Sequence, residues 1–154
     1  MKEIVEEIMT RDVITANEND TVLNVANVLK DNRIAGAPVV NDQEEVVGVV
    51  SVSDILKLLD DFHWYTPFFT AMDILHLRSE DLEDIKRDIE RVSEMKVKDA
   101  MSKNPKKIPP DALIDDVAQI MHSTGFNRLP VVDATGNLVG IVARADIIAS
   151  LYEL

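Results

Sequence analysis

The chain has 154 residues, of which 46% are hydrophobic and 29% charged, which suits one domain or two very small ones sharing a core. Its formal net charge of −12 opposes the charge of nucleic-acid phosphates and argues against nucleic acid as the main partner. The absence of cysteine excludes disulfides and thiolate metal sites. No apolar run approaches the roughly 18 residues of a membrane span, and the acidic N-terminus does not resemble a signal peptide. Composition therefore predicts a soluble cytoplasmic protein.

One segment of the sequence is repeated. Residues 48–54 read GVVSVSD and residues 140–146 read GIVARAD, an offset of 92 that holds without a gap from residues 5–59 to residues 97–151. A unit of fewer than about 60 residues is marginal by itself, so the two copies are expected to pack around a pseudo-two-fold axis. The sequence thus divides into a first unit, an insert and a second unit, at residues 1–62, 63–96 and 97–154.

Each unit is expected to contain helix, strand, helix, strand, strand and helix in that order. In the first unit the patterns place these elements at residues 5–9, 13–15, 22–29, 38–40, 46–50 and 54–61. Asp20 or Thr21 is the expected cap of the middle helix, and Ser51 or Ser53 that of the last helix. Gly48, next to the apolar strand, suits a tight backbone turn. The second unit repeats the pattern, with a hairpin turn at residues 133–136 and a final helix over residues 146–152.

The insert has two parts. Its front half, together with Phe62 just before it, holds five of the seven aromatic residues. Its back half, from Ser79 to Met95, predicts a helix with a narrow apolar stripe formed by Leu82, Ile85, Ile89 and Val92. The pattern leaves open whether this stripe packs inside the chain or against the same helix of a second chain.

The repeated motifs resemble a known family. Met-Thr/Ser, then Pro-Val-Val-Asn/Asp before a turn, then Gly followed six residues later by Asp, is similar to the CBS domain, and two copies in tandem resemble a Bateman module. The resemblance covers nearly the whole chain except residues 63–96. It implies an α/β (α+β) fold of two β-α-β-β-α units paired through their sheets, often as a homodimer. It also implies a regulatory protein that binds AMP, ADP, ATP or S-adenosylmethionine non-covalently in clefts between the units.

The resemblance also implies roles for individual residues. The closing aspartates, Asp54 and Asp146, would accept hydrogen bonds from ribose hydroxyls, and Ser51 and Ser53 would reach ribose or phosphate. Arg128 has the place of a phosphate-binding basic residue. For the Asp146 cleft the resemblance implies Arg128 and Arg144, with Thr10, Thr15, Ile34 and Ala35 from the facing unit; for the Asp54 cleft it implies Ser51, Ser53, Ser102, Lys107, Phe126 and Asn127.

Neither predicted cleft carries the complete family set. The first unit has Gly36 where the second has Arg128, and the second has Ala143 and Ala145 where the first has serines. Because a phosphorylated ligand in so acidic a protein needs a local cation, ideally an arginine, the pattern favours the Asp146 cleft for a nucleotide.

Other interpretations of the same residues stay open. The two aspartates also suit the first turn of a helix without any ligand. The histidines, His63, His76 and His122, have no metal-ligand spacing, and no catalytic constellation is present, so neither a metal site nor an enzyme is predicted. The alternative to a ligand-sensing module that acts on an unidentified partner protein is a structural or dimerisation module whose clefts are vestigial.

Overall fold

Two β-hairpins with the same strand register form the centre of the molecule. The computed structural model describes residues 3–60 and 79–152. In the first half β2 (Gly36–Val40) pairs antiparallel with β3 (Val46–Ser51), and in the second half β5 (Arg128–Val132) pairs antiparallel with β6 (Leu138–Ala143). Each hairpin has a register shift just before the last residue of its first strand. The sequence repeat therefore extends to the details of backbone pairing.

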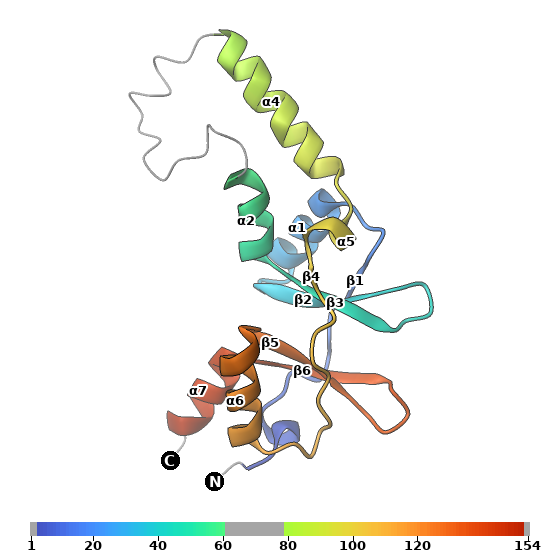
Figure 1. Ribbon diagram of the computed structural model, residues 1–154, viewed down its shortest axis with the longest axis vertical. Coiled ribbons are helices and arrows are strands. Elements are labelled where there is room, and N and C mark those ends of the chain that lie inside the picture. Colours follow the sequence, from blue (N-terminus) through green and yellow to red (C-terminus); the bar gives the residue numbers. More distant parts are fainter. Residues whose placement is uncertain (1–2, 61–78, 153–154) are drawn as a thin grey trace.

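Helices cover the outer side of each hairpin (Figure 1). These helices are α1 (Val22–Asp31), α2 (Val52–Asp60) and α5 (Val97–Ala100) in the first half, and α6 (Ile114–Thr124) and α7 (Arg144–Tyr152) in the second. The long helix α4 (Ser79–Glu94) extends away from the hairpins (Figure 1). Thr21 caps α1, because its hydroxyl oxygen accepts a hydrogen bond from the Asn24 N–H at 3.2 Å. Within the described residues no helix has both the length and the apolar character that a bilayer span requires.

Short elements complete both sheets in equivalent ways. In the first half β1 (Ala16–Asn17) pairs parallel with β2, and β4 (Ser102–Lys103) pairs antiparallel with β3, which gives the order β1-β2-β3-β4. In the second half the equivalent positions form isolated bridges, Ile108 with Val131 and Thr10 with Ile141. The predicted fold class, two pseudo-symmetric units of mixed helix and strand, is confirmed.

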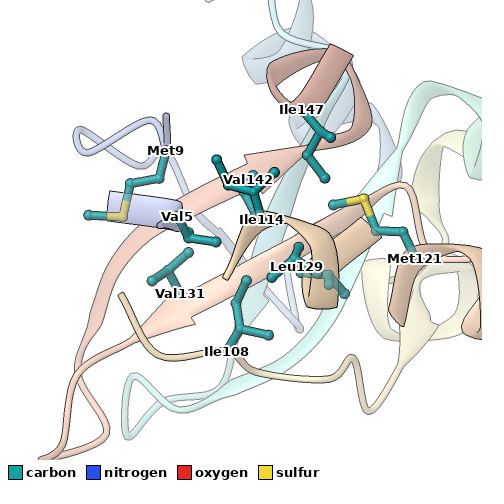
Figure 2. Packing of buried hydrophobic residues seen from close by; sticks show 10 residues of the cluster. Val5, Met9, Ile108, Ile114, Met121, Leu129, Val131, Val142 and Ile147 are labelled. Carbon is teal, nitrogen blue, oxygen red and sulfur yellow. The ribbon is translucent and has the colours of Figure 1, made fainter. Parts of the chain in front are cut away.

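The two halves exchange their first segments. The 3-10 helix η1 (Val5–Glu7) lies against the second half, where the Val5 N–H donates to the Ala112 carbonyl at 2.9 Å. Val5 and Met9 belong to the buried cluster that contains Leu129, Val131 and Val142 (Figure 2). In the same way Val97, on α5, is fully buried in the first half's cluster, and Met101 packs against that cluster. Each hydrophobic core is therefore completed by residues from the other half of the sequence.

Glycine makes this exchange possible. A Cβ atom at Gly48 would overlap the Sδ of Met101, and one at Gly140 would overlap the Sδ of Met9. Neither glycine has positive φ, in contrast to Gly136 in the hairpin turn. The prediction that Gly48 serves a tight turn is therefore wrong: it lies within β3, where the close approach of a methionine leaves no room for a side chain.

One further prediction differs from the structure. The strand expected at residues 13–15 is displaced to Ala16–Asn17, where the small Ala16 side chain is 4% exposed and pairs with Val39. The predicted helix after Ser79 is present as α4, which contacts α1 and α2 within the chain. Val92 is buried there, whereas Ile89 is 46% exposed. The aromatic part of the insert lies outside the described residues.

The exchange predicts that a change in the first segment destabilises the opposite half. Val5→Ala removes two buried methyl groups and should lower the free energy of unfolding by about 2 kcal/mol. Native-state hydrogen exchange should show the larger loss of protection in β5 and β6. Val97→Ala, at the equivalent position, should lower protection mainly in β2 and β3. Glu6→Ala, at an exposed neighbour of Val5, is the control. If Val5→Ala weakened only β2 and β3, the exchange would be contradicted.

Candidate functional site

A cleft lies between the end of β3 and the start of β5, where the two halves meet. Its volume is about 190 Å³, and its lining includes hydroxyl, carboxylate, cationic and aromatic side chains. The residues that line it are Val49, Ser51, Ser53, Asp54, Lys57, Ser102, Thr124, Gly125, Phe126, Asn127 and Arg128. Because β3 and β5 contact each other, neither half could form this cleft alone.

Asp54 is fixed at the start of α2 by local hydrogen bonds. Its Oδ2 accepts from the Ser51 N–H at 2.8 Å and from the Ser51 hydroxyl at 3.0 Å. The Ser51 Oγ in turn lies 3.3 Å from the Asp54 N–H, so Ser51 is the helix cap. Within the described residues Oδ1 of Asp54 accepts no hydrogen bond, so this oxygen is available to a ligand hydroxyl.

Two cations, Lys57 and Arg128, border the cleft. Lys57 follows Asp54 by one helical turn and is exposed, whereas Arg128 is half-buried at the start of β5. In the part of the chain that the structure describes, neither side chain makes a hydrogen bond or an ion pair. Two uncompensated positive charges beside one carboxylate favour an anionic ligand.

The turn after α6 also borders the cleft. Gly125 ends this helix with a φ of 77°, and its N–H donates to the Met121 carbonyl at 3.0 Å. The left-handed residue directs the chain so that Phe126 and Asn127 lie over the cleft. The equivalent residue in the first half is Arg33, with a φ of 54°, so the repeat keeps this helix end although the glycine is absent.

The structure corrects the predicted grouping of Arg128. Sequence analysis placed Arg128 in the Asp146 cleft, but Arg128 lines the cleft of Asp54, together with Ser51, Ser53 and Asn127. The reason is that its side chain crosses to the first half: a Cβ atom at Gly36 would lie 2.9 Å from both Cδ and Nε of Arg128. The preference for the Asp146 cleft therefore loses Arg128, the main cation on which it rested.

Lys107 and Thr15 lie elsewhere, in a hollow of about 960 Å³ beside the two hairpin turns. Lys107 was predicted for the Asp54 cleft and Thr15 for the Asp146 cleft, and the structure brings them together instead. The carboxylates that line this hollow are those of Asp12, Glu44 and Glu45, against the cations of Arg11 and Lys107. This balance disfavours an anionic ligand.

The hairpin turn beside this hollow is tightly hydrogen-bonded. The Thr135 hydroxyl and the Asn137 N–H donate to the Asp133 carboxylate at 2.7 and 2.9 Å and lower the pKa of Asp133 below 3.8. No group of three or more metal-binding side chains occurs among the described residues.

The remaining predicted residues have structural partners. The Asp146 Oδ2 accepts from the Ala143 N–H at 2.7 Å, which repeats the cap at Asp54. The Arg144 N–H donates to the Asn127 carbonyl, and the Val52 N–H donates to the Ala35 carbonyl, both at 2.9 Å. Ile34 packs against the first core cluster. Thr10 exchanges backbone hydrogen bonds with Ile141 on β6, as Ser102 pairs with Val49 on β3.

Sequence reasoning did not identify four residues that line the cleft: Val49, Lys57, Thr124 and Gly125. Lys57 had a usable signal, because a residue three positions after Asp54 lies on the same face of a helix. Thr124 and Gly125 could be recognised only as a helix end, and which cleft that end borders depends on how the halves pack.

The fold and the cleft together define a tandem-repeat module with a polar site between its two units. The CBS domain family model matches residues 5–61 and 97–153. The chain belongs to the CBS domain family, as a pair of CBS domains.

Individual relatives agree with this assignment. The chain is 33% identical over 155 residues to an uncharacterized protein, MJ1426, of Methanocaldococcus jannaschii, covering 96% of this chain and 90% of that protein. It is 28% identical to the chloroplastic CBS domain-containing protein CBSX1 of Arabidopsis thaliana, covering 97% of this chain and 64% of the relative. Among solved structures it is similar to CBSX2 in complex with AMP, with 25% identity, a TM-score of 0.69 and coverage of 99% of this chain and 98% of that one.

Proposed function

We propose that this chain is a regulatory module that binds an adenosyl compound in the Asp54 cleft and transmits its presence to a partner protein. The observation that carries the proposal is the pair of cations, Arg128 and Lys57, which lie beside Asp54 in one cleft and have no partner among the residues that the structure describes. In a protein with a net charge of −12, such a local positive site favours a specific small anion. AMP is the reference ligand, because the similar CBSX2 structure is a complex with AMP; ADP, ATP and S-adenosylmethionine are the other candidates.

Each part of such a ligand has a complementary group in the cleft. The free Oδ1 of Asp54 accepts from ribose hydroxyls, and the hydroxyls of Ser53 and Ser102 reach ribose or phosphate. Arg128 and Lys57 neutralise the phosphate, while Phe126 offers an aromatic surface to adenine. The volume of about 190 Å³ is below the roughly 300 Å³ of common small-molecule sites, so the ligand fills the cleft and part of it faces solvent.

Ser102 connects the cleft to the insert. It lies on β4, which follows α5, and α5 follows the long helix α4. A ligand that holds Ser102 against β3 therefore restrains the segment that carries α4. The ligand shifts the population of α4 orientations by its differential affinity for them, and this changes the surface that a partner protein contacts.

The binding proposal is tested by replacing the aspartate while keeping the helix cap. Asp54→Asn retains a side-chain oxygen for the Ser51 N–H but loses the charge that accepts ribose hydroxyls, so AMP affinity should fall roughly 10-fold or more. Isothermal titration with AMP measures this effect. Asp146→Asn makes the same change at the equivalent cap and is the matched control, expected to keep AMP affinity.

The result also separates the two function classes. A folded wild type that binds no AMP, ATP or S-adenosylmethionine at millimolar concentration would contradict the ligand-sensing proposal and leave the structural module. If Asp146→Asn weakened AMP binding and Asp54→Asn did not, the choice of cleft would be wrong.

We also propose a homodimer formed through α2 and α7. Leu56 and Ile148 occupy equivalent positions of the repeat on these helices and are 42% and 48% exposed. Farther along α7, Leu151 and Tyr152 are 60% and 84% exposed. Large apolar side chains left exposed on both helices favour an interaction surface there.

Ile148→Glu should convert the dimer to a monomer, because it places a charge in a desolvated contact. Light scattering coupled to size exclusion measures the mass. Gln119→Glu, an equally acidic change at an exposed position on α6, is the control and should leave the mass unchanged. A wild type that is monomeric at micromolar concentration would overturn the proposal.

A further inference from the structure

Gly36 and Arg128 occupy the same position of the repeat and face each other across the pseudo-two-fold axis. Each is the first residue of its strand, Gly36 in β2 and Arg128 in β5, and they pair with the equivalent residues Ser51 and Ala143. The Arg128 side chain fills the space that a side chain at Gly36 would occupy, since a Cβ there would lie 2.9 Å from its Cδ and Nε. The two positions therefore have room for one long side chain between them.

Gly36 is not required by its backbone conformation. It is absent from the glycines with positive φ, which are Gly125 and Gly136. The backbone contact is also close, since the same Cβ would lie 3.0 Å from the Val50 carbonyl oxygen. The glycine is thus explained by what lies over it, which is the arginine side chain together with the Val50 carbonyl oxygen.

The side chains around Asp54 are more polar and more positively charged than those at the equivalent positions around Asp146. Beside Asp54 the chain has Ser51, Ser53 and Lys57, and it receives Arg128 from the other half. The positions equivalent to these four are occupied by Ala143, Ala145, Ala149 and Gly36. The two hydroxyls and two positive charges of the first set are missing from the second, although the capping aspartate is kept in both. The second half retains Thr10 at the position equivalent to Ser102, and Arg144 lies two residues before Asp146.

We propose that Gly36 is a positioning residue for Arg128 and thereby makes the module one-sided: it takes one phosphorylated ligand per chain, in the Asp54 cleft. The absent side chain at position 36 lets the guanidinium cross from β5 to the first half. This inference rests on the proposed function and adds to it which chemical group of the ligand selects the cleft. It also predicts the binding stoichiometry, one ligand per chain.

The experiment compares AMP with adenosine, which differ only in the phosphate. Titrations are made with the wild type, Gly36→Ala, Arg128→Ala and the double variant. Removal of the guanidinium should weaken AMP by roughly 10- to 100-fold, the usual effect of losing a charge-assisted hydrogen bond, and should leave adenosine affinity nearly unchanged. Gly36→Ala should show the same selective loss, because its methyl group displaces the Arg128 side chain.

The double variant distinguishes positioning from a general structural effect. If Gly36 acts through Arg128, adding Gly36→Ala to Arg128→Ala causes no further loss of AMP affinity. Should Gly36→Ala fail to fold alone, Arg128→Ala in the same chain should restore folding, since it removes the two nearest atoms and leaves the new methyl group only the 3.0 Å contact with the Val50 carbonyl oxygen. Lack of such recovery would overturn the proposal.

The remaining outcomes are equally decisive. A wild type that binds two AMP molecules per chain, or a folded Gly36→Ala variant with an unchanged ratio of AMP to adenosine affinity, would overturn the inference and leave the proposed function standing. A folded wild type that binds neither compound would overturn the proposed function itself, and the inference with it.

Discussion

The exchange of first segments between the two halves is the contact on which the rest of the molecule depends. Val5 and Met9 complete the core of the second half, Val97 belongs to that of the first, and Met101 packs against it. A domain of about 60 residues buries only about 60% of the surface that its unfolded chain exposes. Through the exchange both cores draw on the whole chain, and the two hairpins are held face to face. The cleft at Asp54 exists because of this arrangement.

The two aspartates have the same local structure but different surroundings. Helix capping explains the shared local structure, and crowding of equivalent side chains at the pseudo-two-fold axis explains the difference. Asp54 and Asp146 both accept a hydrogen bond from the N–H three residues earlier, because both begin a helix whose first N–H groups need an acceptor. Capping alone therefore accounts for an aspartate at these places. A pseudo-two-fold axis brings equivalent residues together, so two long side chains would compete for one space, and Gly36 beside Arg128 resolves this conflict on one side.

The same exchange places the insert within reach of the cleft. The chain runs from α4 through α5 to β4 without a long loop, and Val92 anchors the end of α4 in the protein interior with 4% exposure. Ser102, on β4, lines the cleft. A ligand effect on α4 thus needs a change in one continuous segment and no chain of separate contacts. This short connection supports the proposed regulatory role, because binding in the cleft can act directly on the segment that carries α4.

The sequence by itself determined the units, their order of elements and the two capping aspartates. Gap-free repetition specifies which backbone positions are equivalent, and the helix and strand periodicities specify most local structure. Only the tertiary structure decided which residues share a cleft. The position of Arg128 on its strand is local information, but the direction of its side chain depends on the missing side chain at Gly36, 92 residues away in the sequence. The exchange of η1 and α5, and the use of Gly48 for Met101, were undetermined for the same reason: a repeat is unchanged when equivalent segments trade places.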